Sequence, residues 1–107
     1  MCKTHPGIDI KGDLGTEIKS SSDGIVQTIQ QDGFYGNTVK ILDSEGYIFV
    51  YSNLDGEISL KEGDSIKQGE IIGKIGVSAA GELADESHLH FEIIKDETQV
   101  NPVDLIN

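Results

Sequence analysis

Basic residues are scarce in this chain of 107 residues, where 8 Lys and Arg stand against 19 Asp and Glu and the formal net charge at pH 7 is −11. Proteins bind nucleic acids largely by placing Lys and Arg against phosphates, and a strongly acidic surface repels those phosphates. Nucleic-acid binding through a basic face is therefore excluded. An anionic membrane surface is disfavoured for the same reason.

Long apolar runs and paired cysteines are also lacking. No apolar run approaches the roughly 20 residues of a membrane helix, and no signal peptide opens the chain. Cys2 is the single cysteine, so it cannot form an internal disulfide, and we interpret it as an incidental terminal residue. Because His5 has almost no chain ahead of it to shield a site, we expect residues 1–107 to be a single domain of a longer membrane-anchored or secreted protein.

Short strands separated by turns are indicated along most of the chain. Thr, Val, Ile and Tyr recur at short spacing between turn signals such as Asp32-Gly33 and Asp55-Gly56, and no long window has a helical period. The predicted strands are Ile25 to Gln31, Asn37 to Leu42, Tyr47 to Ser52, Glu70 to Ile75 and His88 to Lys95. The fold class that follows is all-β, as an antiparallel sheet or barrel-sandwich.

Two segments do not follow this pattern of short strands and turns. Gly76 to Ser87 is a loop of about a dozen residues that leads into His88, and a loop of that length is either a binding rim or simply mobile. Asn101 to Ile106 is predicted to pack as a short capping turn, because Pro102 cannot continue a central strand.

All three histidines of the chain lie in two short motifs. His5 precedes Asp9 by four residues, and Pro6-Gly7 between them can bend the chain so that both side chains reach one point. His88 and His90 are two residues apart on a predicted strand, so their side chains share a face. Two imidazole nitrogens and one carboxylate oxygen suit zinc and leave a fourth position open for water, as in catalytic sites.

Each motif also has an ordinary structural explanation. A His-x-His pair on a strand is more often an exposed polar face than a ligand pair, and His-x-x-x-Asp alone is weak evidence. The hypothesis of a metal site depends on the combination of the two motifs at the two ends of one β domain. In such a site, His88 would be available to move protons.

Seven motifs follow one another in a distinctive order. They are H-P-G-I-D-I at 5–10, D-G-I-V at 23–26, G-N-T-V at 36–39, K-E-G-D-S-I-K-Q-G at 61–69, I-G at 72–73, H-L-H-F-E-I at 88–93 and N-P at 101–102. In this order they resemble the lysostaphin-type (LytM, M23) zinc endopeptidases of bacterial cell walls, over nearly the whole chain.

The resemblance implies an all-β domain of the duplicated-hybrid-motif type, whose antiparallel sheet forms a groove with zinc on its floor. It implies that His5, Asp9 and His90 hold the zinc. It also implies that His88 is a catalytic residue that polarises the attacking water or steadies the tetrahedral intermediate. The substrates would be short peptide crosslinks of peptidoglycan.

One position departs from the family pattern. Where these enzymes usually have a second catalytic His in Tyr-x-His-Leu, this chain reads Tyr51-Ser52-Asn53-Leu54. Asn53 can donate a hydrogen bond to an oxyanion, but its amide cannot exchange protons near pH 7. Because general acid-base groups contribute about 10² to 10⁴ in rate, we predict a domain that binds zinc and hydrolyses little or nothing.

The same departure, with the acidic loop before His88, narrows the resemblance to the stage II sporulation members of the family. It implies an extracytoplasmic domain in the space between forespore and mother-cell membranes, held by an N-terminal anchor. The implied partners are a peptidoglycan peptide and a stage III sporulation protein of the mother cell. We therefore predict a degenerate M23-type module that binds one or both of them.

Two alternatives stay open from the sequence. In the first, the domain is an active endopeptidase in which Asn53 and His88 suffice, or in which Tyr51 substitutes for the missing His. In the second, the His-x-Gly-Ile-Asp segment resembles sugar phosphotransferase domains, so that His5 would accept a phosphoryl group and no metal would be needed. The His88-Leu89-His90 pair disfavours the second alternative, because those domains place their second active-site His upstream.

Overall fold

The computed structural model describes residues 8–77, 88–95 and 98–100, which form nine strands and no helix. The strands are β1 (Ile8–Lys11), β2 (Glu17–Lys19), β3 (Gly24–Asp32), β4 (Gly36–Leu42), β5 (Tyr47–Leu54), β6 (Ser65–Ile66), β7 (Ile71–Lys74), β8 (His88–Lys95) and β9 (Thr98–Val100). Accordingly, these residues contain no helix of a length and apolarity that would cross a bilayer.

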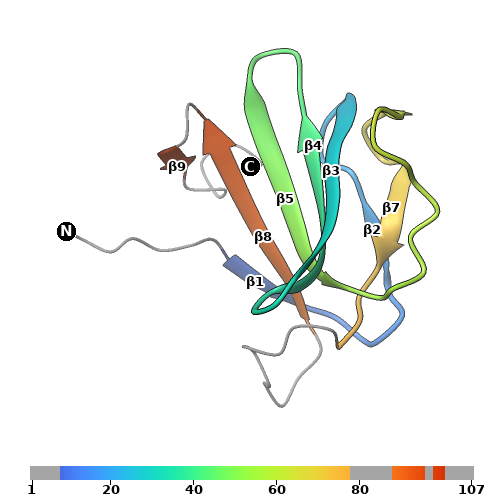
Figure 1. Cartoon of the computed structure of the whole chain (residues 1–107). Coiled ribbons are helices and arrows are strands. Elements are labelled where there is room, and N and C mark those ends of the chain that lie inside the picture. Colours follow the sequence, from blue (N-terminus) through green and yellow to red (C-terminus); the bar gives the residue numbers. More distant parts are fainter. Residues whose placement is uncertain (1–7, 78–87, 96–97, 101–107) are drawn as a thin grey trace.

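The strands form two sheets (Figure 1). The larger sheet has the order β1-β8-β5-β4-β3-β6, and β9 pairs with β8 on the same side as β1. All of its pairings are antiparallel. The smaller sheet consists of β2 and β7, which lie beyond β3 in the view of Figure 1. β8 is therefore an interior strand, with β5 along one side and β1 and β9 along the other.

The core lies between the two sheets and holds most of the large apolar side chains. β3, β4, β5 and β8 contribute fully buried residues such as Val26, Ile41 and Ile93, and the β7 segment contributes Ile72 and Ile75. Gly24 permits close strand contact, because a Cβ there would lie 2.5 Å from the carbonyl oxygen of Leu42. This packing fixes β8 against β5 and so fixes the direction of its polar side chains.

The predicted all-β antiparallel architecture is confirmed. Each of the five predicted strands is present, and β8 has the predicted bounds His88–Lys95. The sequence analysis missed β1, β2, β6 and β9, which have two to four residues each. Two or three residues are too few to show alternation, and pairing with a neighbour decides such strands. β1 has four residues, as the predicted β7 does, and its alternation as Ile-Asp-Ile-Lys was a usable signal. The predicted capping turn at Asn101 to Ile106 lies outside the described residues, as does the predicted loop after Val77.

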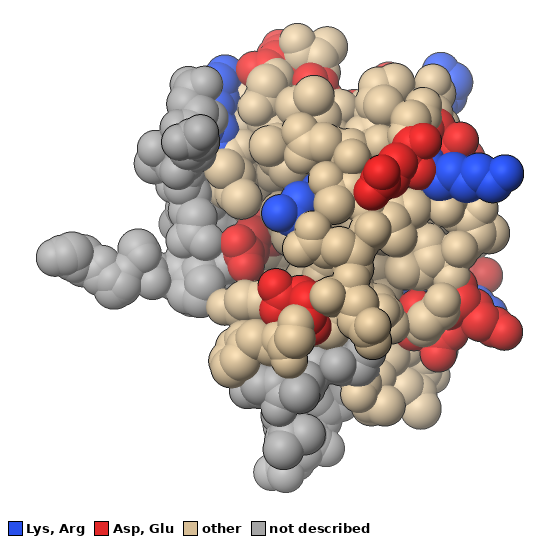
Figure 2. Space-filling view, viewed as in Figure 1, with Lys and Arg blue, Asp and Glu red and all other residues tan. Residues whose placement is uncertain are grey.

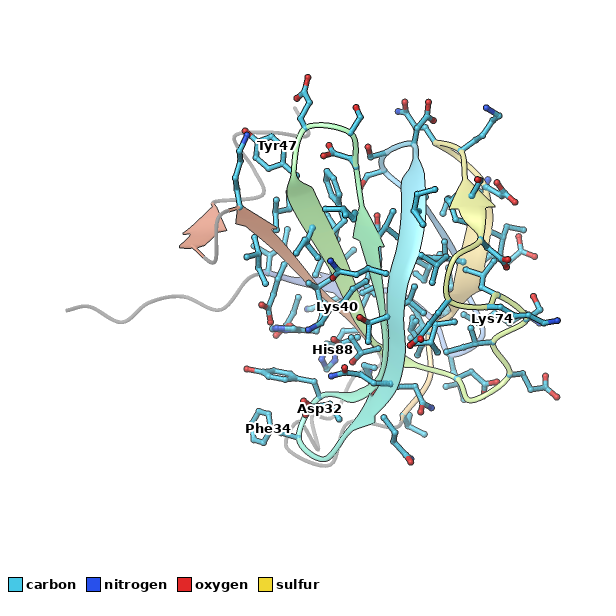
Figure 3. The ribbon with its side chains drawn as sticks, turned by 45° about the horizontal axis from the view of Figure 1, so that its top comes forward. Asp32, Phe34, Lys40, Tyr47, Lys74 and His88 are labelled. Carbon is cyan, nitrogen blue, oxygen red and sulfur yellow. The ribbon has the colours of Figure 1, made fainter. Side chains whose placement is uncertain are left out.

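The turn between β3 and β4 is held by the carboxylate of Asp32. Its Oδ1 accepts hydrogen bonds from the main-chain N–H groups of Phe34 at 2.7 Å and Tyr35 at 2.8 Å. These bonds, with a smaller contribution from the charge of Lys40, lower the pKa of Asp32 below its usual 3.8. Figure 3 shows Asp32 and Phe34 at this turn, and the ring of the next residue, Tyr35, stacks on the imidazole of His90. The turn thus orients Tyr35 toward the histidine motif.

We expect acid to weaken this turn. Because the folded-state pKa of Asp32 is lowered, the stabilisation is fully present above 3.8 and is lost as the pH falls through the lower, folded-state value. An NMR titration should therefore shift the amide resonances of Phe34 and Tyr35 with a midpoint below 3.8. Asp32→Asn is the matched control, because it keeps the acceptor oxygen and removes the titration. A midpoint at or above the usual value would contradict this assignment.

Candidate metal and catalytic site

β1 and β5, which pair with β8 on either side of His90, place polar residues next to that histidine. In the sheet register, His90 is opposite Asp9 of β1 on one side and opposite Ser52 of β5 on the other. The row continues into β4, where Oγ1 of Thr38 lies 3.0 Å from Oγ of Ser52. Ser52 and Thr38 are both buried. A line of polar side chains therefore crosses the sheet from the edge strand β1 to β4.

His90 is enclosed on several sides. Its Nδ1 lies 2.8 Å from Oδ1 of Asp9, and its Nε2 lies 2.9 Å from Oε2 of Glu92. The ring of Tyr35 stacks on the imidazole, with 4.6 Å between centroids and 18° between planes. Only 4% of His90 is exposed. The orientation of this imidazole is thus set by the fold.

His88 lies next to the same carboxylate. Its Nε2 is 3.9 Å from Oδ1 of Asp9, and the residue is 6% exposed. Both histidines of the motif are therefore buried, which excludes the alternative that His88 and His90 form an ordinary exposed polar face. The side chain of Asp9 is 55% exposed, so the carboxylate lies at the opening of the site.

Asn53 is buried behind the histidine motif. It is the one described residue other than glycine with a positive φ, at 66°, a conformation that Asn and His accept more readily than most residues. Its main-chain N–H donates to the carbonyl of Tyr35 at 2.9 Å, and its carbonyl accepts from the N–H of Gly76 at 2.8 Å. Its side-chain Nδ2 donates to the carbonyl oxygen of His88 at 2.7 Å. The amide thus connects β5 to the first residue of β8.

The donors that the structure describes fit part of a zinc site. Two ligands about 2.1 Å from a tetrahedral zinc stand roughly 3.4 Å apart, and the Asp9 carboxylate lies 2.8 Å from His90 and 3.9 Å from His88. Over residues 8–77 and 88–95, no three His, Cys, Asp or Glu side chains form a group able to hold a metal ion. The predicted ligand His5 lies outside the described residues, so the three-ligand set stays a prediction.

Sequence reasoning missed two residues that contact His90. Glu92 lies on the same face of β8 as His88 and His90, because side chains alternate along a strand. This alternation could have predicted its contact with His90. Tyr35 gave no such signal. It lies in a turn 55 positions before His90 in the chain, and only the pairing of β3, β4, β5 and β8 brings the two rings together.

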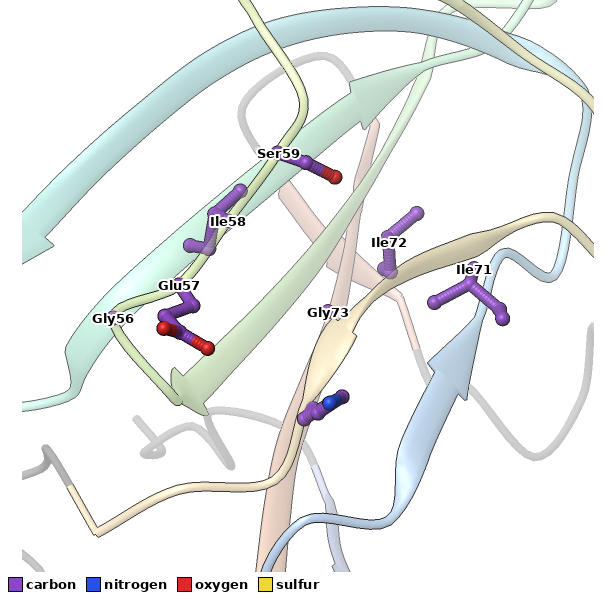
Figure 4. Close-up of a pocket in the computed structure, with 8 residues that line it drawn as sticks. Gly56, Glu57, Ile58, Ser59, Ile71, Ile72 and Gly73 are labelled. Atoms are coloured by element: carbon purple, nitrogen blue, oxygen red, sulfur yellow. The ribbon is translucent and has the colours of Figure 1, made fainter.

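A separate hollow of about 500 Å³ lies elsewhere on the domain, between Gly56–Ser59 and β7 (Figure 4). Ile58 and Ile72 supply part of its apolar lining, and Glu57 and Lys74 carry its charges. None of the predicted site residues lines it. The surface view in Figure 2 shows Asp and Glu side chains in several groups with few Lys between them, in line with the acidic composition.

The chain matches one protein-family model and several curated relatives. Residues 3–102 match the family model described as Peptidase family M23. The chain is 33% identical over 103 residues to stage II sporulation protein Q of Bacillus subtilis, covering 94% of this chain and 36% of that protein. It is 35% identical over 100 residues to peptidoglycan DD-endopeptidase ShyC of Vibrio cholerae, covering 94% and 22%. The chain thus spans about a third or less of the length of these relatives.

Solved structures share the fold. The catalytic domain of lysostaphin from Staphylococcus simulans superposes with a TM-score of 0.84 at 26% identity, covering 95% of this chain and 78% of that one. A zinc-containing peptidase from Vibrio cholerae gives 0.80 at 29% identity, covering 90% and 28%. A crystal structure of the SpoIIIAH and SpoIIQ complex gives 0.72 at 34% identity, covering 82% and 60%.

Proposed function

The chain belongs to peptidase family M23, a family of zinc metallopeptidases, and from that membership we propose a zinc-binding domain of the bacterial cell envelope. We further propose that it binds a peptidoglycan peptide or a partner protein, with weak or no hydrolysis. Two features support this proposal. The predicted ligands His5, Asp9 and His90 suit zinc, and Asn53 stands where the family resemblance predicts a proton-carrying His.

The arrangement around Asn53 carries the proposal. Asp9 and His90 converge to 2.8 Å at the opening of the site. By the family resemblance, the neutral amide of Asn53 would stand where these enzymes usually have their second catalytic His. That amide donates to the main-chain carbonyl of His88 at 2.7 Å. Because the Asn53 side chain cannot exchange protons and already donates to the backbone, it suits a structural role and not proton transfer.

The roles of the side chains follow from their positions. His5, Asp9 and His90 would hold zinc, which when bound polarises a carbonyl and lowers the pKa of a bound water. His88 is the remaining imidazole beside Asp9, and its Nε2 is 3.9 Å from that carboxylate. It would carry protons alone, because Asn53 cannot share the task.

Relatives named for sporulation and for peptidoglycan cleavage support the proposed location and partners. Similarity to stage II sporulation protein Q and to SpoIIQ in complex with SpoIIIAH supports an extracytoplasmic place between forespore and mother cell. It also supports a mother-cell partner resembling stage III sporulation protein AH. Similarity to a peptidoglycan DD-endopeptidase supports a peptidoglycan peptide as the other ligand.

An active endopeptidase is the second candidate. It is favoured by the 35% identity to ShyC, whose name records endopeptidase activity, and by the presence of His88 beside Asp9. In that case His88 would act as the sole imidazole proton carrier.

Purified peptidoglycan separates the two candidates. The chain, with its metal content measured, is incubated with peptidoglycan, pelleted to measure binding, and the soluble products are analysed by mass spectrometry. We expect about one zinc per chain, binding to the pellet, and product levels equal to those of His88→Ala. Crosslink cleavage that His88→Ala abolishes would establish the active enzyme instead. Phosphohistidine formation with a phosphocarrier, in a protein without zinc, would support the phosphotransferase alternative.

A further inference from the structure

We propose that Glu92 is a positioning residue for His90: its carboxylate holds the Nε2–H of the imidazole and thereby reserves Nδ1 for zinc. This inference rests on the proposed zinc-binding function. It assigns to Glu92 a role separate from that of the predicted ligands His5, Asp9 and His90.

The contacts of His90 distinguish its two ring nitrogens. Nε2 lies 2.9 Å from Oε2 of Glu92, and the two side chains are 5% and 12% exposed. Nδ1 lies 2.8 Å from Oδ1 of Asp9, whose side chain is 55% exposed. One nitrogen thus points into the domain toward a buried carboxylate, and the other points toward the opening of the site.

Binding of a metal requires that one ring nitrogen present its lone pair while the other keeps its proton. Asp9 is itself a predicted ligand. A proton shared between its Oδ1 and Nδ1 of His90 would therefore keep both atoms from binding zinc. A hydrogen bond in which Oε2 of Glu92 accepts from His90, at the 2.9 Å seen here, places the ring proton on Nε2. Nδ1 is then the nitrogen left for zinc.

The strand holds Glu92 in this place. Residues two apart on a strand share a face, so Glu92 and His90 are neighbours on the same side of β8. On one side of β8, Glu92 is paired with Val50 of β5. On the other side, β1 pairs with β8 as far as Phe91 and β9 pairs from Ile93. Stacking of Tyr35 on His90 limits rotation of the ring. A bond between such buried groups is stronger than one in water, and its loss costs more.

Zinc affinity and the state of the His90 ring test the proposal together. Carboxylates that hold a metal-ligating His raise metal affinity about 10- to 100-fold, so Glu92→Ala should weaken zinc binding by that factor in calorimetric titrations. Glu92→Gln should regain part of the loss, because its side-chain oxygen can still accept from Nε2–H. In ¹⁵N-histidine NMR of the zinc-saturated wild type, His90 should show a metal-bound Nδ1 and a protonated Nε2. Glu92→Ala should lose the slowly exchanging Nε2 proton.

Two control variants sharpen the test. Glu17→Gln removes one charge at an exposed position of β2 and should leave zinc affinity unchanged. Asp9→Ala removes a predicted ligand and should cost more than Glu92→Ala. Equal losses of zinc affinity in Asp9→Ala and Glu92→Ala would indicate that Glu92 is itself a ligand, and would overturn the positioning role.

The remaining outcomes separate this inference from the proposed function. Equal zinc affinities of the wild type and Glu92→Ala would overturn the role of Glu92 and leave the proposed function standing. Binding of zinc through Nε2 of His90 would also overturn it. Wild type that binds no zinc would overturn the proposed function, and the role of Glu92 would fall with it.

Discussion

Asn53→His is expected to raise the rate of peptidoglycan crosslink cleavage by about 10² to 10⁴, the usual contribution of a general acid-base group. An imidazole exchanges protons near neutral pH, and the amide that it replaces does not. The backbone should accept the change, because φ at this position is 66° and His adopts such values more readily than most residues. Soluble muropeptides released by the zinc-loaded variant, quantified over time by chromatography and mass spectrometry, measure the effect.

Two variants control this experiment. Asn53→Ala loses the 2.7 Å bond to the carbonyl of His88, and we expect it to lower the free energy of unfolding by about 1–3 kcal/mol without any gain in cleavage. Asn53→His combined with His88→Ala should return to the wild-type rate. If Asn53→His folds and binds zinc yet gains no activity, the missing His is not what limits hydrolysis, and the groove itself has lost its catalytic geometry.

His90→Ala is expected to lower zinc affinity by more than about 100-fold. Loss of residues that only orient a ligand costs about 10- to 100-fold, and a ligand itself must contribute more. His90 has the closer contact with Asp9, at 2.8 Å between Nδ1 and Oδ1. Competition with a chelating dye, monitored by absorbance, gives the affinity of each variant.

His88→Ala is the matched control for that measurement, because it removes the other imidazole of the same strand. Its Nε2 is 3.9 Å from Asp9, and its predicted role is catalytic, so zinc affinity should change little. Greater zinc loss in His88→Ala than in His90→Ala would reverse the two assignments. Thermal unfolding of both variants without metal separates loss of a ligand from loss of the fold.

Much of the architecture was readable from local sequence. Alternating apolar residues and β-branched side chains between glycine turns predicted the four longest strands, β3, β4, β5 and β8, together with the four-residue β7. The parity of β8 also predicted that His88 and His90 share a face, and both lie beside Asp9. His5 lies outside the described residues, and its place in the zinc site stays a prediction.

Other features had no local signal. The positive φ of Asn53 arises where β5 meets the carbonyl of Tyr35 and the N–H of Gly76, contacts between segments distant in the chain. The burial of both histidines depends on strands β1 and β5 on either side of β8. A His-x-His pair reads the same in a sequence whether its face is covered or open.

The order of the residues by itself determined the strand periods, the acidic charge, the family pattern and the presence of Asn53 where the family resemblance predicts a His, because these depend on residue identity and spacing alone. Only the tertiary structure decided which atoms meet: Asp9 and Glu92 on opposite nitrogens of His90, Tyr35 on its face, and the Asn53 amide on the carbonyl of His88. The physical reason is that sheet register joins residues as distant in the chain as Asp9 and His90, which are 81 positions apart, and no local pattern records that pairing.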